Sequence, residues 1–205
     1  MRPVKIGWIA VSSLVLLGSN HCLARSIIRE PGHHPAYSVE LEPHFVLDWA
    51  GAPGPSDEGF GVGFRASIPL FSNGPISKIN NNMAISFGLD WAHGSHPCGP
   101  PRPGWEGDWA YDCSLDSFWV PVALQWNFFL TEVISVFGEP GLAIAHYRWD
   151  HWQHCWAPGY CDPDGNETRL KPVLWGGARF LVSDSIGFTV RLGYPSITAG
   201  VSLLL

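Results

Sequence analysis

Charged residues are scarce in this 205-residue sequence, since Asp, Glu, Lys and Arg together make up only 15%. Soluble domains average roughly 25%. The formal net charge of −6 excludes a basic nucleic-acid-binding surface, so we expect no nucleic-acid partner. Beyond the N-terminal segment, no stretch of about 18 consecutive apolar residues could form a transmembrane helix. Because 46% of the residues are nevertheless apolar, either the core is unusually large or part of the outer surface does not face water.

Residues 1–24 have the organisation of a secretory signal peptide. Arg2 and Lys5 form a basic start, residues 6–17 are mostly apolar, and small residues precede a cleavage position at the end of the segment. The apolar run is shorter than the roughly 20 residues that a membrane-spanning helix needs. We therefore predict export, with a short N-terminal extension over residues 25–36.

Large apolar residues alternate with small or polar ones in eight runs, and this period of two is typical of β-strands. In the first run Phe45 stands at an odd position and Glu40 at an even one, and nearly all neighbours follow the same rule. No run has a convincing helical period. The predicted strands cover residues 37–49, 59–70, 82–91, 117–128, 133–147, 170–182, 186–194 and 197–205.

The connections between the runs alternate in length, as they do in outer-membrane barrels with short periplasmic turns and longer outer loops. Those after the third and fifth runs, residues 93–116 and 148–169, are long. Those after the second, fourth and sixth runs are shorter, and residues 195–196 form a very short last connection. The sequence therefore predicts an all-β fold, an eight-stranded antiparallel up-and-down transmembrane β-barrel over residues 37–205.

Side-chain size predicts which face of the barrel meets lipid. One face carries Phe, Trp, Leu, Ile and Tyr, whereas the other is rich in Gly, Ala, Ser and Thr with isolated charges. Eight strands enclose an interior just wide enough for side chains, so the bulky face must point outward. Buried charges need partners, and we expect an ion-pair network that plugs the lumen, with a narrow polar path as the alternative. The predicted interior ionisable residues are Glu40, Glu42, His44, Asp48, Arg65, Asp90, Glu139, Lys171, Arg179 and Arg191.

The signal peptide, the eight alternating runs and a last strand ending at apolar Leu205 resemble the small OmpA-type and OmpX-type outer-membrane barrels. The resemblance is architectural and covers residues 37–205. It implies an outer-membrane location, contact with outer-membrane lipid and lipopolysaccharide, and insertion by the outer-membrane assembly machinery. In those families the last strand usually ends in Phe, so this chain departs from the pattern at its final residue.

Three prolines fall inside predicted strands, at Pro43, Pro121 and Pro140. Proline cannot donate a ladder hydrogen bond, and a closed barrel has no edge strand to accommodate it. We therefore expect β-bulges or shifted strand boundaries at these positions.

Four cysteines follow the signal peptide, in two close pairs within the long connections. An exported protein meets an oxidising compartment, so we predict a disulfide within each pair. For the second pair, His151 and His154 leave a metal site as the alternative. The predicted disulfides join Cys98 to Cys113 and Cys155 to Cys161.

The long connections are also rich in tryptophan. Large aromatic residues on outer loops suggest an extracellular ligand bound through residues 93–116 and 148–169. The alternative is that these side chains pack on one another. The tryptophans are Trp105, Trp109, Trp149, Trp152 and Trp156.

The predicted function is that of a non-enzymatic outer-membrane barrel with a structural, surface-binding or minor pore role, without catalytic residues, cofactor or metal. One alternative is a lipid A deacylase or acyltransferase, because some outer-membrane barrels carry such sites with Ser and His near the outer rim. His93 and Ser95, with Glu106 and Asp108 nearby, fit such a scheme. A periplasmic lipocalin-like binding barrel is a further alternative.

Overall fold

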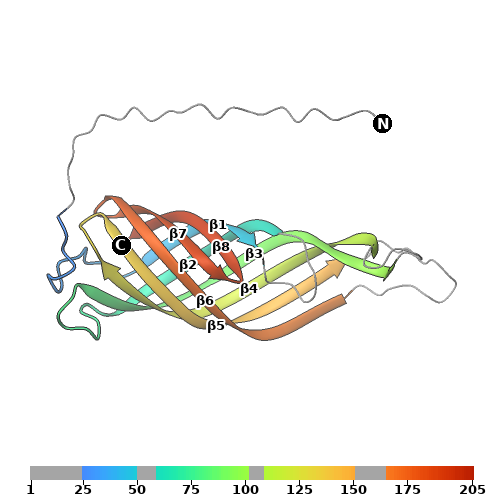
Figure 1. Cartoon of the computed structure of the whole chain (residues 1–205), viewed down its shortest axis with the longest axis horizontal. Helices are drawn as coiled ribbons and strands as arrows, with labels where there is room; N and C mark the ends of the chain where they lie inside the picture. Colours follow the sequence, from blue (N-terminus) through green and yellow to red (C-terminus); the bar gives the residue numbers. More distant parts are fainter. Residues whose placement is uncertain (1–24, 50–58, 102–108, 151–164) are drawn as a thin grey trace, which may run out of the picture.

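The alternating runs form eight antiparallel strands that close into a barrel (Figure 1). The computed structural model describes residues 25–49, 59–101, 109–150 and 165–205. Each strand pairs with its neighbours in chain order, and β1 pairs with β8 to complete the barrel, which confirms the predicted fold class. The strands are β1 (Glu40–Asp48), β2 (Gly59–Phe71), β3 (Asn81–Pro101), β4 (Trp109–Phe129), β5 (Ile134–Asp150), β6 (Gly165–Ser183), β7 (Ile186–Tyr194) and β8 (Ser196–Leu204).

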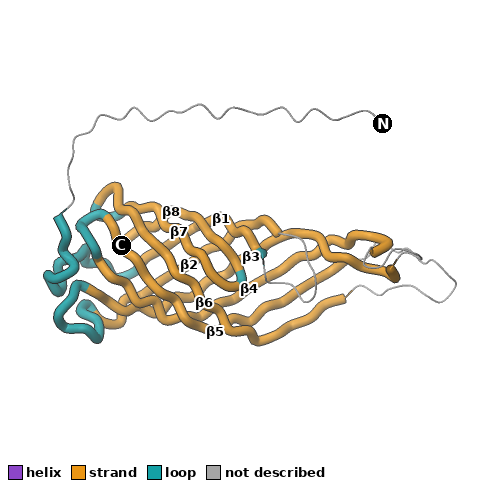
Figure 2. The backbone as a smooth tube through the Cα atoms, in the orientation of Figure 1, coloured by secondary structure: helices purple, strands orange, loops and turns teal. Residues whose placement is uncertain are grey.

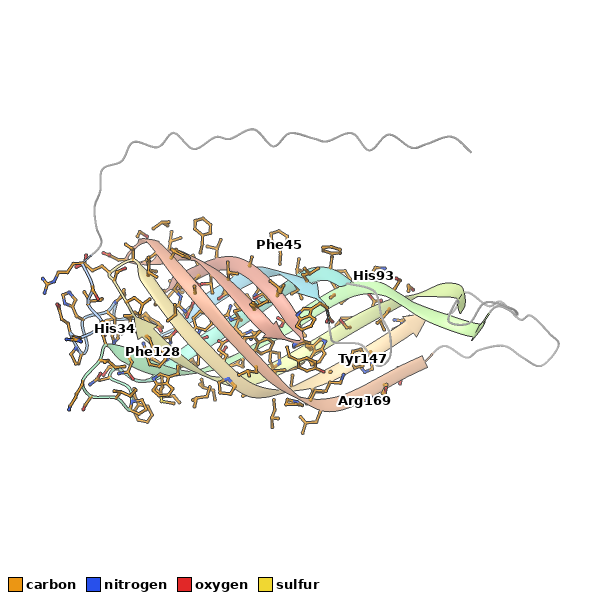
Figure 3. The ribbon with its side chains drawn as sticks, in the orientation of Figure 1. His34, Phe45, His93, Phe128, Tyr147 and Arg169 are labelled. Atoms are coloured by element: carbon orange, nitrogen blue, oxygen red, sulfur yellow. The ribbon has the colours of Figure 1, made fainter. Side chains whose placement is uncertain are left out.

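The period of two places large apolar side chains outside the barrel and charged ones inside. On β1, Glu40 and Glu42 are 1% exposed, whereas Phe45 is 75% exposed and points away from the barrel in Figure 3. Outward apolar residues on the other strands, such as Phe64 and Leu124, are exposed in the same way. A soluble barrel has the opposite distribution, with apolar residues inside.

Strands β3 to β6 are longer than predicted, and they reach past the other four strands at one end of the barrel (Figure 2), here called the projecting end. The predicted extents of the loops 93–116 and 148–169 are therefore wrong, because both loops contribute residues to these strands at each side. The hydrogen bonds of an antiparallel ladder join backbone groups, so two strands can stay paired where their side chains do not alternate between apolar and polar. The strand extensions lack this alternation, and the sequence pattern therefore did not predict them.

The prolines do not produce the expected bulges. Around Pro43 the β1–β8 ladder omits two residue pairs and then resumes in the same register. Pro121 and Pro140 interrupt the β3–β4 and β4–β5 ladders in the same way. Each proline removes a donor on one side only, and the pairs around it hold the register. The register shifts of the described ladders lie between Pro69 and Phe71, Cys98 and Pro101, and Leu181 and Ser183.

The N-terminal extension packs across the other end of the barrel, here called the turn end, where residues 72–80, 130–133 and 184–185 connect the strands (Figure 1). The amide of Ile27, a residue only 1% exposed, donates to the carbonyl of Leu130 at 3.0 Å. The amide of Asn80 donates to the carbonyl of Ile28 at 2.7 Å, and its side-chain amide donates to the carbonyl of His33 at 2.7 Å. This segment has no strand periodicity, and the sequence did not predict its packing.

Candidate functional site

The lumen holds a network of buried charges. The structure buries every predicted interior ionisable residue except Lys171, which is partly exposed near the projecting end. The buried members are Glu40, Glu42, His44, Asp48, Arg65, Asp90, Glu139, Arg179 and Arg191.

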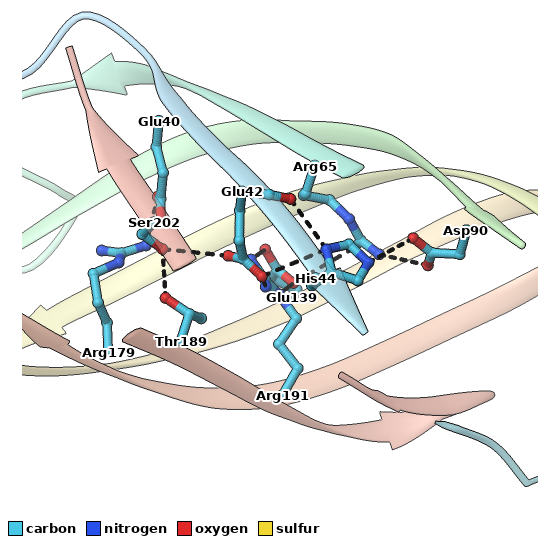
Figure 4. Close-up of polar contacts among 10 residues, drawn as sticks. All are labelled: Glu40, Glu42, His44, Arg65, Asp90, Glu139, Arg179, Thr189, Arg191 and Ser202. Atoms are coloured by element: carbon cyan, nitrogen blue, oxygen red, sulfur yellow. Dashed lines mark hydrogen bonds and ion pairs between the residues drawn. The ribbon is translucent and has the colours of Figure 1, made fainter. Parts of the chain in front are cut away.

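Arginines from opposite walls of the barrel connect the carboxylates (Figure 4). Arg191 on β7 donates through Nη1 to the Glu42 carboxylate and through Nε to Oε2 of Glu139, 2.7 Å away. Arg65 on β2 donates to Oδ2 of Asp90 at 2.8 Å, and its Nη1 lies 3.8 Å from Oε2 of Glu139. The network therefore crosses the lumen.

Nearer the turn end, Arg179 on β6 forms a separate pair with Glu40 on β1. Nη2 of Arg179 donates to Oε2 of Glu40 at 2.5 Å. The buried ring of Phe137 lies under both guanidinium groups, 5.7 Å from that of Arg179 and 5.0 Å from that of Arg191. Such cation–π contacts stabilise the charged guanidinium groups where they are buried.

His44 joins the network from β1. Nε2 of His44 lies 2.9 Å from Oδ1 of Asp90, and Nδ1 lies 3.1 Å from the backbone carbonyl of Glu42. The imidazole therefore links the carboxylate of Asp90 to the backbone of β1. Each of the three buried arginines, Arg65, Arg179 and Arg191, contacts at least one carboxylate, as the burial of a charge requires.

A glycine on β2 makes room for this histidine. A Cβ atom built on Gly63 would overlap the imidazole of His44 and lie 2.5 Å from Oδ1 of Asp90. Only a residue without a side chain leaves the His44–Asp90 pair intact, which explains a glycine in the middle of this strand.

Aromatic side chains fill the lumen near the projecting end. The ring of Trp119 meets those of Tyr147 and Tyr194 edge to face, at centroid distances of 5.9 and 6.4 Å. The ammonium of Lys171 lies 5.6 Å from the Trp119 ring and 5.1 Å from the Tyr147 ring. Large aromatic residues inside were not predicted, although Trp119 alternates with the outward residues of its strand as the small inward residues do.

Outside the barrel, polar side chains of neighbouring strands contact one another near the projecting end, where Figure 3 labels His93; this region is here called the rim. Nδ1 of His93 on β3 donates to Oδ1 of Asp116 on β4 at 3.0 Å, and Nε1 of Trp91 donates to the same oxygen at 3.1 Å. On β5 and β6, Nδ1 of His146 is hydrogen-bonded to the Thr168 hydroxyl at 2.8 Å. Sequence reasoning did not pair His93 with Asp116, because only the strand register brings them together.

The cysteine predictions stay predictions. Cys98 lies opposite Tyr111 and Cys113 opposite His96, so the two cysteines are two register positions apart on neighbouring strands. The other predicted disulfide, the metal alternative and the acidic residues suggested for His93 fall outside the described residues. These are Cys155 and Cys161, His151 and His154, and Glu106 and Asp108.

The residues that the structure describes include no group of three or more His, Cys, Asp or Glu arranged to hold a metal ion. They also include no helix that is long and apolar enough to cross a membrane.

Comparison with known proteins connects this chain to others through its structure alone. No family model matches the sequence, and no curated protein matches it. The structure is similar to that of Neisserial surface protein A, with a TM-score of 0.54 and 11% identity, over 82% of this chain and 97% of the other. The predicted resemblance to small eight-stranded barrels is thereby confirmed for the fold. Ail of Yersinia pestis has a TM-score of 0.46 and 10% identity, over 81% and 97% of the two chains.

Proposed function

We propose that the chain is an outer-membrane β-barrel with a sealed lumen, which anchors the projecting sheet of β3 to β6 at the cell surface. The exposed apolar side chains around the barrel support the membrane location, because a protein surrounded by water would not expose Phe45, Phe64 and Leu192 together on one belt. The same distribution argues against a periplasmic lipocalin-like barrel, whose apolar residues would face inward.

The observation that carries this proposal is the ion-pair network across the lumen. Arg191 reaches from β7 to carboxylates on β1 and β5, and Arg65 reaches from β2 to β3. The aromatic cluster around Trp119 lies on one side of the network, and the N-terminal extension closes the turn end on the other. An ion path through these layers would have to break buried, neutralised pairs, so a pore role is disfavoured.

The projecting sheet is suited to contact by side chains. In the described part of the chain, β6 pairs with β7 only from Leu174 onward, so residues 165–173 form a free edge. This edge carries an ion pair between Arg169 and Glu167, at 2.5 Å, and Pro172. Charges and proline hinder the addition of another strand. We infer that an extracellular ligand binds to the faces of this sheet, with lipopolysaccharide around its base.

Two measurements test the membrane assignment together. A closed membrane barrel resists SDS until it is boiled, since its backbone hydrogen bonds are all internal. We expect unboiled and boiled samples to migrate differently, and the protein to stay in the membrane after carbonate extraction. Identical mobility together with extraction by carbonate would contradict the proposed function.

A further inference from the structure

The outward rim of β3 and β4 brings a serine, a histidine and a carboxylate to one place. His93 and Asp116 are direct partners in the strand register and are joined by the 3.0 Å hydrogen bond from Nδ1 to Oδ1. The indole of Trp91, two residues before His93 on the same strand, donates to the same oxygen and holds the carboxylate in place. Ser95 follows His93 by two residues and therefore lies on the same face of β3. Because Nδ1 is taken by Asp116, Nε2 is the ring nitrogen that can accept a proton.

We propose that Ser95, His93 and Asp116 form a catalytic triad that hydrolyses carboxylic esters of membrane lipids. A serine becomes a nucleophile when a base takes its proton and a third group orients that base. Asp116 is the positioning residue, in place of Glu106 or Asp108, which the sequence suggested. This activity goes beyond the anchoring role and replaces the sequence-based expectation that the chain has no catalytic residue.

The position of the triad on the barrel indicates the substrate class. Below His93 on the outward face of β3, Leu89 and Phe87 are 52% and 43% exposed, and Phe60 on β2, directly beside His93, is 68% exposed. The acyl chains of a lipid that packs on this apolar surface would end at the level of His93, where the rim begins. The ester bond of a membrane lipid lies at that boundary, between its acyl chains and its polar headgroup. Phospholipids and the acylated glycolipid of the outer leaflet share this ester chemistry.

The proposed reaction uses Ser95 as nucleophile and His93 as base. After side-chain rotation brings Oγ of Ser95 to Nε2 of His93, Oγ attacks the ester carbonyl carbon and Nε2 takes its proton. The tetrahedral intermediate expels the alcohol, which receives that proton, and leaves an acyl-serine. Water then attacks the acyl carbon with His93 as base, releasing the fatty acid and restoring Ser95. Among the described residues, the β2–β3 ladder ends at the pair Phe60–His93, so the reacting groups lie at the end of this ladder.

Fatty-acid release from defined lipids tests the proposal. Folded protein in detergent is incubated in separate arms with a phosphatidylcholine and with purified lipopolysaccharide, and the products are measured by mass spectrometry. A fluorophosphonate probe, which labels activated serines, gives a second readout by peptide mapping. His146→Asn is the matched control, because His146 is an outward rim histidine whose Nδ1 contacts a hydroxyl and not a carboxylate.

We expect release in at least one arm, and the arm that responds identifies the lipid. Ser95→Ala and His93→Asn should each lower the rate by about 10³-fold or more and abolish labelling of Ser95, while His146→Asn keeps both. Asp116→Asn should lose most of the rate and Asp116→Glu should recover part of it, which a purely structural carboxylate would not do. Each variant is first checked for the heat-dependent gel shift of a folded barrel. Absence of release in both arms, or release that survives Ser95→Ala, would overturn the proposal.

Discussion

The molecule contains two histidine–carboxylate pairs of nearly equal length in opposite surroundings. In the lumen, His44 lies 2.9 Å from Asp90, and on the outer rim His93 lies 3.0 Å from Asp116. The inner imidazole is buried and its second nitrogen is held by the carbonyl of Glu42, whereas the outer ring is about half exposed. The same contact therefore belongs to a buried network in the lumen and orients a base on the rim. The two roles differ because His44 is buried with both ring nitrogens in contact with protein oxygens, whereas His93 is half exposed.

The largest expected effect comes from breaking the inner network at its most connected residue. Arg191→Ala would leave the carboxylates of Glu42 and Glu139 buried without this partner. We expect a loss of about 3–5 kcal/mol in the free energy of unfolding, measured by urea titration in lipid vesicles. Arg169→Ala on the exposed pair with Glu167 is the control, with an expected loss of at most about 1 kcal/mol. Equal losses in the two variants would contradict a buried network.

The outward face of the barrel gives the next effect. Phe87→Arg places a charge in the apolar belt, and we expect a loss of about 2–4 kcal/mol in the same titration. Ser114→Arg, beyond the belt on the exposed rim of β4, should change stability by less than about 1 kcal/mol. If both substitutions were tolerated equally, the belt would not face lipid.

A third prediction sharpens the comparison between the two histidines. His44→Gln removes the imidazole from the buried carboxylate of Asp90, so we expect a loss of about 1–3 kcal/mol in the free energy of unfolding. His93→Gln should leave the free energy of unfolding nearly unchanged, since its pair with Asp116 is partly exposed and screened by solvent. A larger loss for His93→Gln than for His44→Gln would reverse the assigned roles.

The smallest effect concerns the turn end at alkaline pH. Burial raises the pKa of Tyr37 above its ordinary value of 10.0, and its hydroxyl accepts a hydrogen bond from Nδ2 of Asn82 at 3.3 Å. The folded state therefore favours the neutral phenol. Its stabilisation is present below pH 10.0 and is lost as the pH rises through the raised pKa. We expect ultraviolet phenolate absorbance to show a late-titrating tyrosine that Tyr37→Phe removes. An unchanged titration curve in that variant would contradict burial.

Much of the barrel could be predicted from the sequence because β-strands have an exact side-chain period. The alternation of residues such as Glu40 and Phe45 predicted the strand. It also showed that one face of the strand is polar and the other apolar. The extensions of β3 to β6 could not be predicted, because backbone pairing beyond the apolar belt leaves no trace in side-chain polarity. The packing of Ile27 across the turn end was equally hidden, since irregular segments have no period.

Only part of the candidate rim site could be predicted from the sequence. His93 and Ser95 are neighbours on one strand, so their shared face was evident from spacing alone. Asp116 is on the next strand, and its position opposite His93 depends on the register of a long hairpin that the sequence presented as a loop. Aromatic residues inside the lumen, such as Trp119 and Trp175, were not predicted as a cluster, because the inward face was described by its small residues and charges even though the alternation placed Trp119 on it.

The central claim is that the barrel sits in the membrane with its lumen sealed by paired charges. Electrical recording across a planar bilayer tests it most directly, once the heat-dependent gel shift has shown that the inserted protein is folded. We expect no unitary conductance from the wild-type protein at any ion type or voltage that leaves the bilayer intact. Steady, voltage-independent conductance steps would contradict the account, because ions would then pass where Arg191, Glu42 and Glu139 are placed in contact.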